Sequence, residues 1–403
     1  APYNPNPGNA PVNFFDAFGT TYNQGFFQLL RRNVEGGPRQ SDLQHTNYRA
    51  VIGSKGKLGE VWSYDAYYQY GRSNYAQVYS NEFSVARLNR ALNVINDPRA
   101  GSATFGQPIC RSVLDGSDPA CVPYNVFNGQ GGASQAAVSY LSATGFQKGY
   151  TSEQVLSGSV TGLLGQYGLK TPWSDDGVSV NIGAEHRKEK LNLNTDNAFQ
   201  TGDLTGQGGA TLPLSGGFDV SEIFAETNMP IVRDGFFYDL SFDAAYRKSW
   251  YKKSNGGKYN TNTYKLGVNF APVRDIRLRG AYNRAVRAPN IQELFATPTV
   301  ALNGSSDPCA GITVTATDYG CIAQGLIVGS GTAANPAGQY NGLIGGNVDL
   351  QPEKATTKTF GVVIQPSFIR RLAITVDYFD IKVDNAIRSF GQDSTLADCT
   401  DNA

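Results

Sequence analysis

The stretch RDGFFYDLSFDAAYRKSWYKKSNGGKYNTNTYKLGVNFAPVRDIRLRGAYNRAVR, residues 233–287, has the clearest alternating pattern in this chain. Apolar or aromatic side chains occupy every second position over 238–246, 264–270 and 276–282, and mostly polar residues lie between them. A period of two indicates β-strands with two chemically different faces. Short turn-forming segments separate the three runs, which predicts an antiparallel meander. Its second face carries Asp, Arg, Lys and Asn in place of a second core.

The same alternation continues on both sides of this stretch. Working outward, it recurs at 62–70, 152–169, 178–184, 223–229, 360–364 and 372–378. Together with a long extended segment before residue 58, these runs predict about ten strands. Near Asp380 the pattern slips, because Ile381 and Val383 take the other parity. This slip predicts either a β-bulge or the edge of the apolar band.

The predicted connections fall into two length classes that alternate along the chain. Those near residues 59, 173, 234, 274 and 370 are short. Those at about 80–144, 195–218 and 290–351 are long, and the turn near 256 is a short exception. Short helices are expected near 85–95 and 134–141. Outer-membrane β-barrels combine short periplasmic turns with long extracellular loops, whereas a soluble sandwich gives no reason for such a difference.

Composition is compatible with that class. The chain has 403 residues and a formal net charge of zero, so nothing favours binding to nucleic acid. No run of about 18 apolar residues predicts a transmembrane helix, but a transmembrane β-strand needs only about ten residues with one apolar face. Aromatic residues beside the short turns suit an interfacial girdle; they are Trp62, Trp173, Phe236, Phe237 and Phe368.

Five cysteines lie in loop-like sequence. Cys110 and Cys121 are close in sequence, and so are Cys309 and Cys321, which predicts two local disulfides and an oxidising compartment. Cys399 is left over, and we expect its partner to lie past residue 403. No cluster of Cys or His has the spacing of a metal site.

Three stretches resemble the TonB-dependent outer-membrane receptors. NRAVRAPNIQELF at 283–295 is similar to the family's R-x-P-x-x-x-E-L-F signature, and DLQPEK at 349–354 is similar to its N-P-x-L-x-P-E segment, although Val348 stands where Pro is common. TVDYFDIKVDNAI at 375–387 is similar to a family strand with the pattern V-D-Y-x-x-I-x-x-x-I. The signature residues are Arg287, Pro289, Glu293, Leu294, Phe295, Pro352 and Glu353.

The resemblance implies an antiparallel transmembrane β-barrel of about 22 strands with a plug domain inside it. We expect residues 1–403 to form part of one such barrel, with the plug, the TonB box and the C-terminal strands not in this chain. It also implies a place in the outer membrane of a Gram-negative bacterium, among lipid and lipopolysaccharide. TonB, reached through the missing plug, and an extracellular small-molecule ligand are the other expected partners.

Two sets of side chains are candidates for contact with a plug or a ligand. The first set is expected to face the lumen: Asp239, Asp243, Arg277, Arg279, Glu222 and Glu226. The second set consists of aromatic residues in the long connections: Tyr124, Phe127, Tyr319 and Tyr340. Aromatic faces suit sugars and catecholate or peptide ligands alike, and packing of the long connections on themselves is the alternative. For the signature residues we favour a structural role, in which Pro289 ends strand pairing and Arg287 binds a carboxylate.

The predicted function is TonB-dependent active uptake of a scarce ligand, either a ferric siderophore or an oligosaccharide. A passive porin-like channel and a soluble β-rich adhesin or binding domain are alternatives. No catalytic constellation is visible, since His45 and His186 are isolated, so we expect neither an enzyme nor a cofactor.

Overall fold

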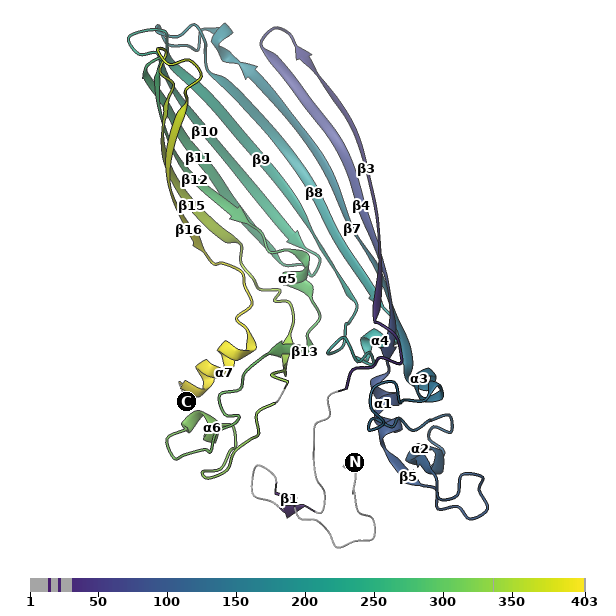
Figure 1. Ribbon diagram of the computed structural model, residues 1–403. Coiled ribbons are helices and arrows are strands. Elements are labelled where there is room, and N and C mark those ends of the chain that lie inside the picture. The colour runs from purple at the N-terminus through teal and green to yellow at the C-terminus, as the bar shows by residue number, and fades with distance from the viewer. Residues whose placement is uncertain (1–13, 16–20, 23–30, 336, 402–403) are drawn as a thin grey trace.

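A computed structural model describes residues 14–15, 21–22, 31–335 and 337–401. Its main feature is one curved ten-stranded sheet (Figure 1). From one edge to the other the order is β16-β15-β12-β11-β10-β9-β8-β7-β4-β3, and every neighbouring pair is antiparallel. The strands are β3 (Gln40–Leu58), β4 (Trp62–Phe83), β7 (Ser142–Leu163), β8 (Ser179–Thr195), β9 (Leu214–Arg233), β10 (Asp239–Lys253), β11 (Lys258–Val273), β12 (Ile276–Arg287), β15 (Glu353–Ile364) and β16 (Ile374–Asp384). The predicted meander of about ten strands is therefore confirmed.

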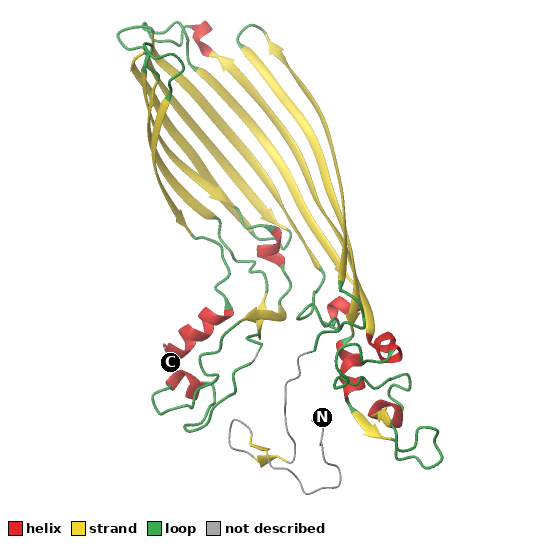
Figure 2. Ribbon diagram, in the orientation of Figure 1, coloured by secondary structure: helices red, strands yellow, loops and turns green. Residues whose placement is uncertain are grey.

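The connections differ at the two ends of the sheet. Short turns join the strands at one end, and the segments 84–141, 196–213 and 288–352 join them at the other. The helices α1 to α7 lie at this second end, as their labels in Figure 1 and the red ribbons in Figure 2 show, whereas the short 3₁₀ helix η1 lies at the short-turn end. None of the helices in the described residues is long and apolar enough to cross a membrane.

The remaining elements are β1 (Phe14–Phe15), β2 (Thr21–Tyr22), α1 (Val85–Leu92), β5 (Val94–Asn96), β6 (Pro108–Cys110), α2 (Arg111–Leu114), α3 (Gln135–Leu141), η1 (Leu164–Tyr167), α4 (Asn197–Gln200), α5 (Ile291–Phe295), β13 (Thr299–Gly304), α6 (Tyr319–Ala323), β14 (Tyr340–Ile344) and α7 (Gln392–Asp401).

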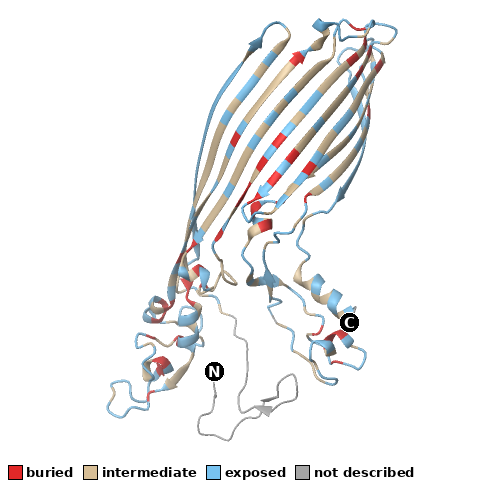
Figure 3. Ribbon diagram, turned by 180° about the vertical axis from the view of Figure 1, so that it is seen from behind, coloured by how far each residue is buried: buried red, intermediate tan, exposed pale blue. Residues whose placement is uncertain are grey.

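Strand register separates the two faces of the sheet. Tyr246 is opposite Tyr264 on one side and Ala225 on the other, so the apolar runs of neighbouring strands share what we call the apolar face. Side chains on this face are open, with Ile182 at 53% and Leu266 at 58% exposure. Figure 3 shows exposed and buried positions alternating along the central strands.

The opposite, polar face is the concave one. Glu222 is only 6% exposed and Asp239 only 4%. Arg279 on β12 reaches Asp377 on β16 at 2.7 Å, although β15 lies between them. Side chains from alternate strands converge in this way on the inside of a curved sheet, while those on the outside spread apart. The sheet is therefore a segment of a barrel with a polar interior and an apolar exterior, as in transmembrane barrels.

Two details of the prediction are corrected. The strand expected at 152–169 is β7, and it begins ten residues earlier, at Ser142. The first half of β7 was not predicted because its outward positions, such as Lys148 and Tyr150, are polar or amphipathic. They therefore do not contrast with the polar residues on the inward face, and no apolar–polar alternation is visible. Near Asp380 there is no bulge, since β15 and β16 pair in continuous register. The slip marks the edge of the apolar band, as the second explanation held.

The first long connection forms a small folded unit. Both predicted helices are present, as α1 and α3, and their buried faces pack around the Cys110–Cys121 disulfide. A second disulfide joins Cys309 to Cys321 in the third long connection. Both predicted disulfides are thus confirmed, and Cys399, in α7, is an exposed free thiol.

Candidate functional site

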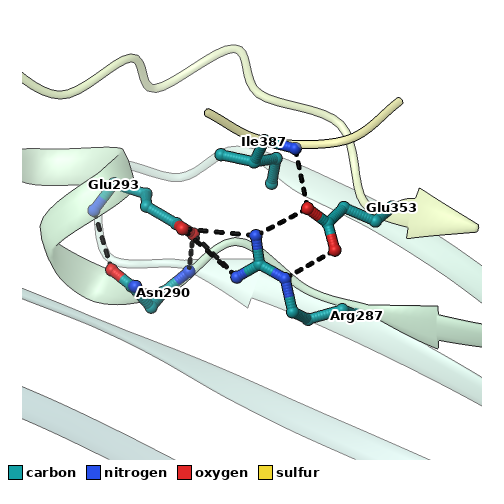
Figure 4. A network of polar contacts seen from close by, with 5 residues as sticks. All are labelled: Arg287, Asn290, Glu293, Glu353 and Ile387. Carbon is teal, nitrogen blue, oxygen red and sulfur yellow. Dashed lines mark hydrogen bonds and ion pairs between the residues drawn. The ribbon is translucent and has the colours of Figure 1, made fainter. Parts of the chain in front are cut away.

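The signature residues meet where β12 ends and the third long connection begins. Arg287, the last residue of β12, binds Glu353 through Nε at 2.7 Å and Nη2 at 2.9 Å (Figure 4). Its Nη1 lies 3.1 Å from Oε2 of Glu293. Glu353 also accepts a hydrogen bond from the backbone N–H of Ile387 at 2.7 Å. One guanidinium therefore joins β12, α5, the start of β15 and the chain after β16, using the fork geometry that suits two carboxylates.

Helix α5 begins immediately after this ion pair. Asn290 accepts a hydrogen bond from the backbone N–H of Glu293, and Glu293 accepts one from the backbone N–H of Asn290. This reciprocal capping box fixes a helix of only five residues. Pro289 is fully buried and supplies no backbone N–H, so strand pairing ends at Arg287.

Helix α5 packs on the polar face of the sheet. Leu294 is 1% exposed, and Ile291 is buried against Phe218, Val220 and Tyr251. These residues form an apolar patch on an otherwise polar wall, and Phe295 packs against it. The Cβ of any residue replacing Gly216 would come within 2.5 Å of the Phe295 ring. The signature thus holds the third long connection inside the curvature of the sheet.

The far end of that connection is held beside α5 as well. The backbone N–H of Asn347 donates to the carbonyl of Glu293 at 2.8 Å, and that of Gly346 donates to the carbonyl of Ala296 at 2.7 Å. Pro352 is buried just before Glu353. The two matching stretches, more than 50 residues apart in sequence, are therefore one structural unit.

All six residues expected to face the lumen share the polar face. Asp239 lies 3.4 Å from Arg233 and 3.9 Å from Arg277. Glu222 binds Arg247 at 2.9 Å and accepts a hydrogen bond from Ser249 at 2.5 Å. Most of these charges therefore have protein partners.

The other members of this set differ in their contacts. Asp243 accepts hydrogen bonds from the amides of Asn228, at 2.8 Å, and Asn269, at 3.3 Å. Arg279 is paired with Asp377. Glu226 is exposed and forms no ion pair within the described part of the chain. Unlike the other five, it has no hydrogen-bond or ion-pair partner among the described residues.

An open hollow of about 430 Å³ lies on the same face between α5 and the strands β3, β4, β7 and β8. The hollow exists because several of the residues that line it have small side chains, among them Gly71, Ser73 and Thr151. Ile291 of α5 forms one of its sides. Glu153 and Glu189 also line it and are directly opposite each other in register. This arrangement was not anticipated from the sequence, because only the register brings these strands together.

The four aromatic candidates in the long connections have different environments. Phe127 is 73% exposed and Tyr319 is 63% exposed. Tyr340 is half-buried and its hydroxyl accepts from the backbone N–H of Asn335. Tyr124 is only 7% exposed and packs edge-on against Phe83. For Tyr124 this burial favours packing within the connection over contact with a ligand, because its ring belongs to the core of the first long connection.

Sequence reasoning missed the contacts that join the long connections to one another. Asp203 accepts hydrogen bonds from Ser84 Oγ at 2.6 Å and from the backbone N–H of Ala86 at 2.8 Å, which links the second connection to the first. Thr297 and Thr299 donate at 3.0 Å to backbone carbonyls of the second connection, which links it to the third. No sequence pattern marks such single polar residues in advance.

Buried Glu82 strengthens the same junction. It accepts hydrogen bonds from Thr205 Oγ1 at 2.8 Å and from the backbone N–H of Gly206 at 2.7 Å, and it lies 3.0 Å from Nε of Arg39. Glu82 stands at the end of β4, so it fastens the second connection to the sheet. Among the described residues, no group of three or more His, Cys, Asp or Glu side chains is placed to hold a metal ion.

Comparisons with solved structures return receptors and transporters. The ferric enterobactin receptor of Pseudomonas aeruginosa is 15% identical, with a TM-score of 0.47, over 85% of this chain and 35% of that one. The RagAB peptide transporter is 13% identical, with a TM-score of 0.43, over 86% of this chain and 30% of that one. The hemophore receptor HasR of Serratia marcescens, in complex with its hemophore and heme, is 12% identical, with a TM-score of 0.33, over 86% of this chain and 46% of that one.

This chain therefore spans less than half of the length of these structures. Among curated proteins there is no match. A family model described as "TonB dependent receptor-like, beta-barrel" matches residues 2–403, which is nearly the whole chain. With its antiparallel sheet of ten strands, polar inside and apolar outside, this chain belongs to the TonB-dependent receptor β-barrel family of the bacterial outer membrane.

Proposed function

We propose that this barrel serves the active, TonB-dependent uptake of a scarce ligand across the outer membrane. The observation that supports this most is the linked assembly of the three long connections at one end of the sheet. In this proposal the long connections lie outside the cell and capture the ligand. TonB supplies the energy through a plug, because the outer membrane has no ATP. A soluble adhesin does not fit an outer-membrane family.

A ferric siderophore is our first choice of ligand, and an oligosaccharide is the second. Two exposed aromatic rings in the long connections, Phe127 and Tyr319, favour a ligand with flat or aromatic surfaces. The polar face would then face the plug. Its charges are mostly paired, which favours a hydrated network that holds the plug over direct contact with the ligand.

The test is uptake by cells that depend on the full-length receptor. We expect a radiolabelled ferric siderophore to accumulate above its external concentration, and accumulation to stop when TonB is deleted or a protonophore is added. A passive channel would equilibrate its solute in both cases. If only a labelled oligosaccharide accumulates, the second choice of ligand holds.

A double variant tests the aromatic rings. Phe127→Ala with Tyr319→Ala should lower the affinity of cells for the ligand by roughly tenfold, since each stacked ring is worth about 0.5–1.5 kcal/mol. The matched control, Phe236→Ala with Phe368→Ala, removes two exposed rings at the short turns and should leave affinity unchanged. Equal loss in both would contradict a ligand site in the long connections.

A further inference from the structure

One buried charge in the described part of the chain has no opposite charge beside it. Lys253, the last residue of β10, is the one buried lysine or arginine among the described residues, at 8% exposure, and it forms no ion pair with any of their carboxylates. The four buried carboxylates, by contrast, each lie 2.8–3.4 Å from an arginine nitrogen; they are Glu82, Asp97, Glu222 and Asp239. Taking a charge out of water is costly unless a partner compensates it. Lys253 is therefore the buried charge that is open to an anion from another molecule.

The ammonium of Lys253 has few contacts. It donates a hydrogen bond to the backbone carbonyl of Val348 and lies 6.0 Å from the centre of the Tyr259 ring. Within residues 31–335 and 337–401 these are its only polar or aromatic partners. Since an ammonium carries three donors, two of its N–H groups remain available. A buried ammonium whose neighbour is a carbonyl suits an acceptor that carries a negative charge.

The turn between β10 and β11 fixes the direction of this side chain. The backbone N–H of Lys253 donates to the carbonyl of Gly257 at 2.8 Å, and a Cβ added at Gly257 would lie 2.6 Å from Cε of Lys253. Pairing with Phe218, which belongs to the apolar patch under α5, places Lys253 on the polar face of the sheet. A lysine on an open surface extends its ammonium into water. The close packing of the turn instead keeps this ammonium under the third long connection.

A thin segment of that connection covers the ammonium. Residues 345–349, with the sequence GGNVD, include its carbonyl partner Val348, whose own side is 39% exposed. The segment belongs to no helix or strand, and backbone hydrogen bonds from Gly346 and Asn347 hold it to α5 and its C-cap. Asp349, the carboxylate next to Val348, forms no ion pair among the described residues. The segment can therefore move without breaking the sheet.

We propose that Lys253 binds an oxyanion group of the ligand, such as a carboxylate or a phosphate, and that this group takes the place of the Val348 carbonyl. The source of the oxyanion rests on the proposed function, in which the long connections capture a ligand. A full negative charge attracts an ammonium more strongly than the partial charge of a carbonyl oxygen does. The ligand therefore carries at least one anionic oxygen, which a neutral oligosaccharide lacks.

This exchange also loosens one end of the third long connection. Space for an oxyanion comes from displacement of residues 345–349, because the turn on the other side is already in contact with the lysine stem. The first end of the connection stays in place, since Leu294 and Ile291 of α5 are buried against the sheet. The charge of the ligand is thus coupled to the docking of residues 345–349 on α5.

The experiment measures hydrogen exchange in the purified full-length receptor, with inorganic phosphate as the probe. The reporters are the backbone amides of Gly346 and Asn347, which are bonded to α5 and its C-cap when the segment is docked. Phosphate at about 20 mM is compared with chloride at the same ionic strength, so that screening is equal in both. We expect phosphate to speed exchange at both amides by at least about threefold in the parent. Lys253→Met removes the charge and should show no phosphate effect.

The matched control is Lys252→Met, which removes the neighbouring lysine on the exposed, outward side and should keep the full phosphate effect. An equal effect in Lys253→Met would overturn the proposal, and so would no effect in the parent. The second result is expected if a carboxylate of the plug already pairs with Lys253. Heat-modifiable migration on a gel checks folding, and if Lys253→Met does not fold, Lys253→Gln takes its place with the same expected loss. The assay needs neither TonB nor transport, so a failure of uptake and a failure of anion binding are seen separately.

Discussion

At the scale of single residues, the family signature anchors the third long connection to the sheet. Arg287 joins two carboxylates that are 60 residues apart in sequence, and Glu293 serves both the ion pair and the capping box. Neither carboxylate is left over to bind a ligand. The structural interpretation of Arg287, Pro289 and Glu293 remains our proposal, and it is supported by these contacts.

Leu294→Ala tests this fastening. The side chain is 1% exposed, so the change leaves a cavity and should cost about 3 kcal/mol in the anchoring of α5. We expect faster proteolysis within 288–352 in the folded barrel. Leu302→Ala, in the same connection but 47% exposed, is the control and should change the rate little. Equal rates for Leu294→Ala and the parent would show that α5 does not hold the connection.

Acid should loosen the first long connection through Asp118. Its carboxylate accepts a hydrogen bond from the Tyr140 hydroxyl at 2.7 Å and binds Arg90 at 2.9 Å, and these contacts, the hydroxyl first, hold the pKa of Asp118 below its ordinary value. A carboxyl whose folded pKa is lowered stabilises the fold above its ordinary pKa of about 3.9, and this stability is lost as the pH falls through the folded value.

The measurement is hydrogen exchange in residues 84–141 between pH 6 and pH 3, corrected for the intrinsic effect of pH. Protection should fall below about pH 4 in the parent. In Asp118→Asn it should be lower at pH 6 and change less with pH. Asp175→Asn, at a short turn, is the control and should behave as the parent does. A parent whose protection is constant down to pH 3 would rule out this role.

At the scale of elements, some strands are longer, and the long connections more ordered, than the alternating sequence pattern predicts. β4 and β7 each have 22 residues, about twice what the apolar band requires. Their outer halves carry polar residues on both faces and continue the sheet into the long connections. The first of these connections is not a loose loop, because α1 and α3 bury residues around a disulfide.

Removing that disulfide should loosen only its own unit. Cys110→Ser with Cys121→Ser opens a short covalent loop, which should cost about 2–3 kcal/mol of local stability. We expect faster hydrogen exchange in α1 and α3 and no change in β10 to β12. The matched control, Cys309→Ser with Cys321→Ser, should act on the third connection instead. Exchange that rises throughout the sheet would show that the unit is not independent.

At the scale of the whole molecule, the two ends of the barrel differ in structure. One end has short turns with aromatic residues, such as Trp173 packed edge-on against Phe236. The other has the three long connections, which bind one another through Asp203, Thr297 and Thr299. This difference gives the molecule a direction in the membrane, and we propose that the long connections face outward.

Cysteine labelling of intact cells tests this direction. The background is the full-length receptor in which Cys399 and its expected partner past residue 403 are both replaced by Ser. Ala103→Cys lies in the first long connection and Asp175→Cys lies at a short turn, and both positions are exposed. A membrane-impermeant maleimide should label the first and not the second. After the cells are broken, both should react, which controls for access. The reverse pattern would place the long connections in the periplasm.

The strands of the sheet apart from the first half of β7, the polarity of its two faces and the alternation of connection lengths can all be predicted from the sequence. These are local properties, because a strand's side-chain period and a turn's residues are set within a few positions of the chain. It also pointed to both disulfides, since their partners are neighbours in sequence.

What the residues do together depends on contacts between segments that are distant in sequence. Tyr124 lies in the core of the first long connection, and the signature residue Arg287 forms an ion pair with Glu353, which is distant in sequence. Each of these depends on strand register or on contacts between distant segments. A change of register gives each residue new neighbours on the adjacent strand but leaves the apolar–polar pattern within each strand unchanged. The periodicity of a single strand therefore carries no information about register.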